Sequence, residues 1–512
     1  MIMKTFDLHQ DRRRFMKMMS AAAATPMMGS LMQAAYAAGP FNDYRALVCV
    51  FLFGGNDSQN MIIPLNPGVG GEYEKYAAGR GNLAIPAASA IPVSAGISGR
   101  TFGFHPSLPN LANIFNIDRK LACVNNVSVL LQPTTKTQYQ AGTNLPPQLF
   151  SHSDMQSHWQ TGRADQPALS GWGGRLGDLI ESANGTSEVS VSITAAGQNL
   201  FQKGDSAVSY AVSGWGGPKS TIVRRLRSYR DWDNYSATRP KPQLAFENQL
   251  YLLRANALED QWGDAATRAL ITSEYVNGAL YNLDASNNPI KDASGNVSEK
   301  FAINPAPPTT YVDSTGVTKT NRLAGQLRSV ASMIAARDSL GVKRQIFFVS
   351  LGGFDNHGDQ FKGSNNATTP ILSGLHSDLL KQLDQALAWF YNWTVSQGIA
   401  NNVTSFTASD FGRTLTSNGQ GSDHGWGGHH FALGGAVSGG TFYGGPSANQ
   451  EFPIVALGSV NEVGQGRLLP TTSVEEYGAT FAKWMGASAG ELNTVFPNLS
   501  RFSRTNGMPF LT

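Results

Sequence analysis

Short apolar runs alternate along this chain with stretches that repeat apolar residues at helical spacing. The runs predict strands at residues 45–53, 121–129, 345–350 and 403–407, and the helical periods lie at 323–338 and 375–390. Strands that alternate with helices in this way pair in parallel, joined by crossover helices. The run at 45–53 is apolar throughout, which is typical of a strand covered on both faces. We therefore predict an α/β fold with a mostly parallel central sheet.

The stretch from residue 184 to 320 has a different character. It holds short alternating segments, a patch rich in Tyr, Arg and Trp at 224–235, and a long polar loop at 283–318. Loops of that length without regular structure are uncommon inside a compact core. We interpret 184–320 as an inserted cap region, which leaves 38–183 and 321–512 as the α/β core.

The first 37 residues read as a targeting segment. Residues 11–17 resemble the twin-arginine export motif, an Ala-rich stretch follows, and residues 35–37 offer a small-x-small cleavage site. Pro26 and Gly29 inside the stretch argue against an uncleaved anchor or an amphipathic helix. We predict a mature chain that starts at Ala38, is carried by the twin-arginine translocase, and is periplasmic or secreted.

Charge and hydropathy then limit the partners of the mature chain. The whole sequence has 39 Lys and Arg against 36 Asp and Glu, and the first 37 residues hold five of those cations and two of those anions, so 34 of each remain. A neutral chain offers no electrostatic footprint for nucleic acid or an anionic membrane. No run in the mature chain approaches the ~18 apolar residues of a membrane span, so we expect no transmembrane segment.

Four polar loops follow strands; each contains an aspartate, two also contain histidine and one also contains arginine. They lie at residues 54–60, 351–359, 409–414 and 422–430. In a parallel sheet, the loops beyond the carboxyl ends of the strands are where ligands bind. Carboxylates and imidazoles gathered there would suit Zn²⁺ or Mn²⁺, and a subset richer in carboxylates would suit Mg²⁺ or Ca²⁺. The sequence therefore predicts a metal site at this edge.

A fifth polar segment, residues 151–163, predicts the start of a helix. The free N–H groups of such a start would favour a bound anion, and a hydroxyl or imidazole there could serve as a nucleophile. The alternative is an ordinary capped helix with polar residues facing solvent.

Several short motifs occur in one order along the chain: Phe53–Asp57, Phe104–Pro106, Ser151–His152, Gly353–His357, Phe411–Thr414, Asp423–His424 and Phe496–Leu499. In this combination, over about residues 43–503, the chain resembles an uncharacterised and mostly twin-arginine-exported bacterial family within the alkaline phosphatase and sulfatase superfamily. The resemblance implies a three-layer α/β/α core with one or two divalent metals. It also implies transfer of a phosphoryl or sulfuryl group through a nucleophile of the enzyme.

The resemblance assigns the metal ligands residue by residue. Zinc is the metal expected first, with manganese, magnesium or calcium as alternatives, and the expected ligands are Asp57, Asp355, His357, Asp410, Asp423 and His424. One position departs from the superfamily pattern, because Phe411 follows the strand-end Asp410 where a histidine is expected. The pair Asp423–His424 restores the pattern farther along, so the alignment of the two segments stays open.

The catalytic residues follow from the same comparison. Counting back from Thr161–Gly162 places His152 at the nucleophile position, flanked by Ser151 and Ser153. Either a serine serves, or His152 itself acts as nucleophile or ligand, or the chain forms no covalent intermediate. Arg413 either stabilises charge on the transferred group or pairs structurally with Asp410 or Asp423.

Two functional hypotheses result. The first is an exported metal-dependent hydrolase of phosphate or sulfate esters, acting on a small-molecule or cell-envelope substrate. The second is a non-catalytic periplasmic binding or assembly protein that reuses the fold.

Overall fold

The computed structural model describes residues 41–68, 70–97, 99–212, 272–285, 290–291, 293, 297–361, 370–445 and 452–511. The predicted export signal at 1–37 and the aromatic patch at 224–235 lie outside the described residues and stay predictions.

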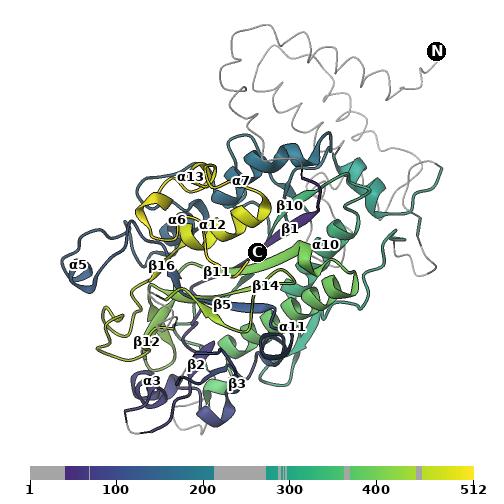
Figure 1. Cartoon of the computed structure of the whole chain (residues 1–512). Coiled ribbons are helices and arrows are strands. Elements are labelled where there is room, and N and C mark those ends of the chain that lie inside the picture. Colours follow the sequence, from purple (N-terminus) through teal and green to yellow (C-terminus); the bar gives the residue numbers. More distant parts are fainter. Residues whose placement is uncertain are drawn as a thin grey trace, which may run out of the picture. The chain divides into compact units, whose positions relative to one another are not determined.

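A nine-stranded sheet forms the centre of the molecule (Figure 1). Its strand order is β15-β5-β14-β11-β1-β10-β6-β7, and β16 also pairs with β5. Only the pairs β11–β14 and β14–β5 are antiparallel; the other pairs in this sheet run parallel. The bounds of the strands are β1 Arg45–Phe53, β5 Leu121–Ser128, β6 Ser192–Thr194, β7 Tyr210–Ala211, β10 Arg344–Gly352, β11 Val403–Ser409, β14 Gly428–Gly434, β15 Phe442–Tyr443 and β16 Thr472–Ser473. The predicted α/β class with a mostly parallel sheet is confirmed.

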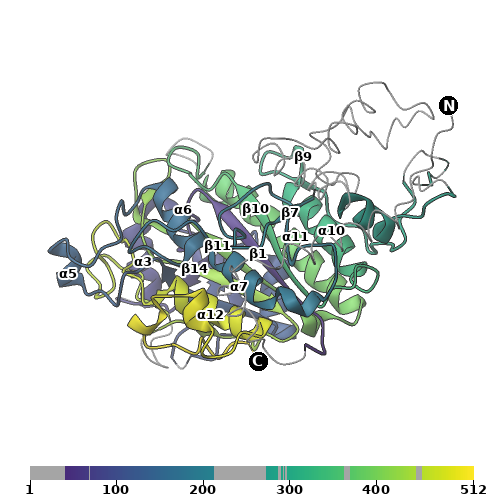
Figure 2. The same cartoon turned by 90° about the horizontal axis from the view of Figure 1, so that it is seen from above.

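Helices cover both faces of this sheet (Figures 1 and 2). One face packs on α4, α10 and α11, and the other on α6, α7, α12 and α13. The bounds are α3 Glu72–Arg80, α4 Pro109–Asn113, α5 Lys136–Gln140, α6 His152–Thr161, α7 Trp172–Ile180, α10 Arg322–Ala335, α11 Leu375–Ser396, α12 Val474–Met485 and α13 Leu492–Val495. Among the described helices, none is long and apolar enough to cross a membrane.

The side chains of β1 explain why the sheet needs two covering layers. Val48 and Val50 belong to the apolar core on the side of α10 and α11, whereas Cys49 and Phe51 belong to the core on the side of α6 and α12. Successive residues of a strand point to opposite faces. An apolar strand without alternation is therefore stable only between two layers, as the sequence of residues 45–53 predicted.

Small sheets surround the core. Their strands are β2 Ile62–Pro64, β3 Ile91–Val93 and β4 Phe102–Phe104 in one sheet, β8 Thr310–Val312 with β9 Thr318–Thr320 in the second, and β12 Arg413–Ser417 with β13 Ser422–His424 in the third. The strands β6 and β7 belong to the segment that we interpreted as an insertion, yet they extend the central sheet beside β10. The sheet therefore continues past residue 183, because a short parallel strand satisfies the outer edge of β10.

Candidate metal centre

Three loops meet at the carboxyl edge of the central sheet, after β1, β10 and β11. Glycines let them approach closely. Gly54 has φ +113°, and a Cβ there would lie 2.3 Å from the amide nitrogen of Asp355. A Cβ on Gly55 would lie 2.5 Å from the ring of Phe411. Side chains at these positions would push the loops apart, so the two glycines allow the polar residues of the loops to gather.

Four predicted residues come together at this edge: His152, Asp355, His357 and His424. The ligand atoms of His152, Asp355 and His424 all lie within 4.8 Å of one another. The carboxylate of Asp355 is 3.4 Å from Nε2 of His152, 3.1 Å from Nε2 of His357 and 3.5 Å from Nε2 of His424. The Nε2 atoms of His357 and His424 are 2.9 Å apart. We call these four residues the His/Asp cluster.

The second nitrogen of each imidazole is held by an acceptor. Nδ1 of His424 donates to the carbonyl of Phe150 at 2.8 Å, because a carbonyl oxygen can only accept. Nδ1 of His152 lies 2.7 Å from the carboxylate of Asp410, and Nδ1 of His357 lies 3.1 Å from that of Asp423. In a neutral imidazole the other nitrogen then carries a lone pair. When all three imidazoles are neutral, the Nε2 atoms of the cluster are therefore bare acceptors.

Bare acceptors in contact repel each other unless a positive charge lies between them. Nε2 of His152 is buried and makes no hydrogen bond to any described residue. Nε2 of His357 and Nε2 of His424 are 2.9 Å apart, and when both imidazoles are neutral their lone pairs face each other. In a tetrahedral zinc site with bonds of about 2.0–2.1 Å, neighbouring ligand atoms are about 3.3 Å apart. The separations of Asp355 from the three Nε2 atoms, and of His357 from His424, lie on either side of that value. His152, Asp355 and His424 together form a group that could hold a divalent cation.

The electrostatics of the His/Asp cluster suit a cation as well. Burial alone would raise the pKa of Asp355, but the hydrogen bond and the charge of Arg413 outweigh burial and lower it. Partial burial lowers the pKa of His424 despite its bond to the carbonyl of Phe150. The hydrogen bond to Asp410 raises the pKa of His152. An ionised carboxylate and a neutral His424 are the forms that bind metals, whereas His152 has to release a proton first.

The other predicted ligands lie outside the His/Asp cluster. Asp410 is fully buried and accepts bonds from the backbone N–H of Gly54, from His152 and from Nε2 of Gln156 at 2.7 Å, so it holds His152 from behind. Asp423 holds His357 in the same manner. Asp57 is buried in an ion pair with Arg80. Carboxylates that orient ligating histidines in this way are common in metal sites.

Two of the predicted catalytic groups have other partners. The hydroxyls of Ser151 and Ser153 both donate to the carboxylate of Asp154, at 2.6 and 3.2 Å, and neither is bonded to the cluster. His152, between them, is the residue that α6 directs into the cluster.

Arg413 is fully buried. It donates to the backbone carbonyls of Gly54 at 2.8 Å, Gly55 at 2.9 Å and Ser422 at 2.5 Å, and to Asp355 at 2.6 Å. The guanidinium therefore links three loops by hydrogen bonds and holds the carboxylate of Asp355 in place. The structure shows Arg413 paired with an aspartate, but the partner is Asp355 and not Asp410 or Asp423 as predicted.

Sequence reasoning missed three residues that support the His/Asp cluster: Phe150, Gln156 and Arg467. Gln156 lies four residues after His152 and hence on the same face of α6, a spacing that could have identified it. Phe150 has φ +77°, a left-handed conformation that costs a non-glycine residue about 1–3 kcal/mol. Nothing in the local sequence distinguishes Phe150 or Arg467, because their roles depend on contacts with His424.

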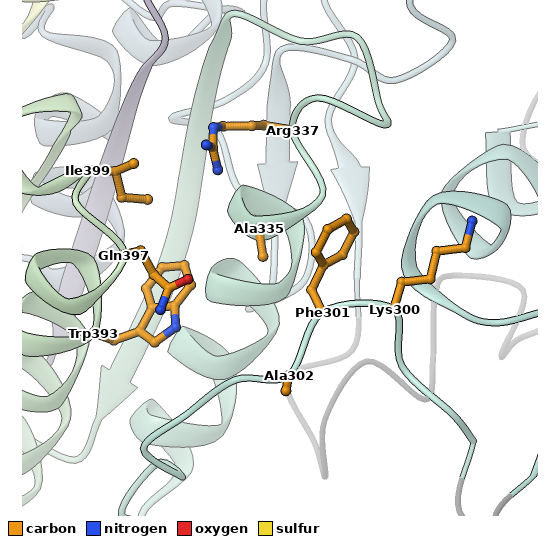
Figure 3. A pocket seen from close by; sticks show the side chains of 8 residues that line it. All are labelled: Lys300, Phe301, Ala302, Ala335, Arg337, Trp393, Gln397 and Ile399. Carbon is orange, nitrogen blue, oxygen red and sulfur yellow. The ribbon is translucent and has the colours of Figure 1, made fainter.

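A separate cavity of about 280 Å³ lies near residues that precede β10 and β11, at the opposite edge of the sheet (Figure 3). It is lined by Lys300, Phe301, Ala302, Ala335, Arg337, Trp393, Gln397 and Ile399. None of the predicted site residues lines it, and its lining has no carboxylate, imidazole or thiol for a metal.

Fold and side chains together define an α/β protein with a three-histidine, one-carboxylate cluster at the carboxyl edge of its sheet. The model of the family described as "Protein of unknown function (DUF1501)" matches residues 44–451, and the chain belongs to this family. No curated protein matches the sequence.

The chain is also similar to several solved structures. One similar structure is i-CgsB in complex with k-i-k-neocarrahexaose, with 9% identity, a TM-score of 0.30, and coverage of 87% of this chain and 73% of that chain. Another comes from a study of glycosaminoglycan metabolism in Bacteroides thetaiotaomicron. It has 10% identity and a TM-score of 0.31, and the match covers 91% of this chain and 75% of that chain. A mutant of the alkaline phosphatase PafA has 10% identity and a TM-score of 0.23, and the match covers 73% of this chain and 64% of that chain. Likenesses at these TM-scores carry no argument about activity, so the proposal below rests on the side chains.

Proposed function

We propose that this protein is a metal-dependent hydrolase of phosphate or sulfate esters, with the His/Asp cluster as its metal site. The observation that carries the proposal is the convergence of three Nε2 lone pairs on one carboxylate, with each Nδ1 already bonded to an acceptor. Such an arrangement is expensive without a cation and typical of metal sites with one.

The ligand set favours zinc. Imidazole nitrogens with one carboxylate oxygen are a common zinc donor set, and manganese accepts the same donors. Magnesium and calcium prefer sites made of oxygen ligands alone. We therefore propose Zn²⁺ first and Mn²⁺ second.

A divalent cation bound here would polarise the ester and lower the pKa of a nearby water molecule. The chain's own residues supply the orientation. Asp410, Asp423 and the carbonyl of Phe150 fix the three imidazoles, and the charge of Arg413 keeps the carboxylate of Asp355 ionised. These contacts keep the ligand atoms aimed at a single point before substrate arrives.

Access to the His/Asp cluster is open on one side. The side chains of Asp355 and His357 are 48% and 43% exposed, whereas His152 and His424 are 28% and 24% exposed and rest against the buried ring of Phe411. An open site admits an ester on a bulky carrier as readily as a small molecule. Since the leader predicts export by the twin-arginine translocase, we propose a cell-envelope or extracellular substrate.

The test is elemental analysis of the chain exported natively and starting at Ala38, with assays on aryl phosphate and aryl sulfate after metal reconstitution. We expect one tightly bound ion per chain and turnover of at least one ester. Asp355→Ala and His424→Ala should lose the ion and stay folded by circular dichroism. His158→Ala is the matched control, because His158 is only partly buried on α6 and its ring contacts the carbonyl of Pro147, not the cluster.

Three outcomes would contradict the proposal in different ways. A chain that binds no metal after reconstitution would favour the non-catalytic binding protein. Full metal content in both alanine variants would refute the assignment of the cluster. Stoichiometric metal without turnover of either ester would refute the hydrolase and leave the metal site standing.

A further inference from the structure

A phosphate or sulfate ester is an anion, and a positively charged side chain beside the metal would bind the oxygens that the metal leaves free. Arg413 was the predicted cation, but its donors are committed to three carbonyls and to Asp355. The hydrogen-bond donors of this buried arginine are therefore taken up by groups of the protein and do not face a substrate. A second charged side chain is therefore the better candidate for contacting the substrate oxygens that the metal leaves free.

Arg467 lies beside the cluster and is only partly buried. Its Nε donates to the backbone carbonyl of His424 at 2.8 Å, so the guanidinium is fixed to the backbone of a cluster residue. Its Nη1 makes a long bond, 3.4 Å, to the carbonyl of Gly464. Its Nη2 has no hydrogen bond or ion pair with any described residue. One edge of the guanidinium is therefore anchored and the other is available.

The ring of Phe150 fixes the plane of this guanidinium. The Cζ atom of Arg467 lies 5.1 Å from the centre of the ring, a cation–π contact. Phe150 is the residue with φ +77° whose carbonyl holds Nδ1 of His424. One strained residue thus orients both the imidazole of His424 and the guanidinium of Arg467, and strained backbone of this kind is concentrated at functional sites.

The positive charge of Arg467 acts on Asp423, the carboxylate that accepts a hydrogen bond from His357. Burial raises the pKa of Asp423, while hydrogen bonds from Asn418 and His357 lower it, and the positive charge of Arg467 adds to the lowering. Arg467 therefore bonds to the backbone of His424 and also acts on the carboxylate that accepts a hydrogen bond from His357.

We propose that Arg467 is the oxyanion-binding and specificity-determining residue of this site, and that it binds the tetrahedral phosphate or sulfate group of the ester through its free edge. The inference rests on the proposed function and deepens it. A guanidinium whose plane is already fixed loses little entropy on binding, and its paired N–H groups match two oxygens of a tetrahedral oxyanion.

The experiment compares Arg467→Gln and Arg467→Lys with the wild-type chain, all loaded with zinc. Calorimetry with inorganic phosphate and with inorganic sulfate needs no turnover, and the two anions show which oxyanion the site prefers. We expect Arg467→Gln to weaken binding of the preferred anion about 10- to 100-fold, the range for a lost charge-assisted hydrogen bond. KM for the ester should rise by a similar factor, with a smaller change in kcat. Arg467→Lys should recover part of the loss, since it keeps the charge without the planar fork.

Arg501→Gln is the matched control, because that partly exposed arginine contacts Leu131 and Asp165 instead. Equal anion affinity in Arg467→Gln and the wild type would overturn the proposal, as would a wild-type chain that binds neither anion. A parallel loss of zinc affinity would also overturn it, because it would show that Arg467 acts by holding His424. If anion binding depends on Arg467 but no ester is turned over, the proposed hydrolase fails while this inference stands.

Discussion

Asp410→Asn is the substitution that tests the metal centre most directly. Asp410 is fully buried behind His152, and its carboxylate accepts the Nδ1–H of His152 and an N–H of Gln156, each at 2.7 Å. The amide has nearly the same shape but no charge, and its NH2 group faces donors. It therefore weakens the bond that keeps Nε2 of His152 bare, without touching any atom that would bind the metal.

The size of the effect follows from the role of this contact. Loss of an orienting partner behind a ligating histidine typically lowers metal affinity 10- to 100-fold. At 1.4 kcal/mol for each factor of ten, this is about 1.4–2.8 kcal/mol of binding free energy. The charge of Asp410 also raises the pKa of His152, so the carboxylate increases the basicity of the nitrogen donor. We expect the effect to lie within this range, because His357, His424 and Asp355 remain.

The assay is a competitive titration of zinc against a chelator at fixed pH, with circular dichroism to show that the variant is folded. Asp384→Asn is the matched control. Asp384 is also buried and accepts hydrogen bonds from Asn110 and from the backbone of Leu111, and neither partner belongs to the cluster. The control should keep wild-type zinc affinity. An unchanged zinc affinity in Asp410→Asn would refute the reasoning that Nδ1 partners define the site.

Three further predictions concern other residues. Ser151→Ala and Ser153→Ala should leave zinc content and ester turnover unchanged, because both hydroxyls bond outside the cluster; loss of turnover with full zinc would restore a serine as nucleophile. Arg80→Met should lower the free energy of unfolding by about 3–5 kcal/mol in urea titrations, because it leaves the buried charge of Asp57 without its partner; a smaller loss would show that Asp57 has other compensation. Glu475→Gln should stabilise the protein: burial raises the pKa of Glu475 to about 8, so the folded state binds the extra proton and loses stability as pH rises from about 4.5 to 8. The gain should reach up to about 3 kcal/mol at pH 7 and vanish near pH 4, and a gain independent of pH would contradict the assignment.

The elements of the fold were largely predictable from local pattern. Strands at 45–53, 121–129, 345–350 and 403–407 correspond to β1, β5, β10 and β11, and the helical period that starts at 323 corresponds to α10. These assignments succeeded because a strand between two layers must be apolar on both sides, and a covering helix must be apolar on one. The pairing of β6 and β7 with this sheet was not predictable, because strands of three and two residues carry little pattern.

The site was predictable in its location and not in its division of roles. The sequence placed His152 at a helix start and Asp355 and His357 after a strand, and parallel strands bring such residues to one edge. His424 was predicted in a loop, but it ends β13 in the antiparallel pair β12–β13, which also reaches this edge. It could not separate the carboxylate that joins the cluster, Asp355, from Asp57, Asp410 and Asp423, which pair with other side chains. Tertiary structure alone decides that difference, because the partner of each carboxylate lies far away along the chain and reaches it only through the fold. The same holds for the two arginines: packing commits the donors of Arg413 to the protein and leaves an edge of Arg467 free.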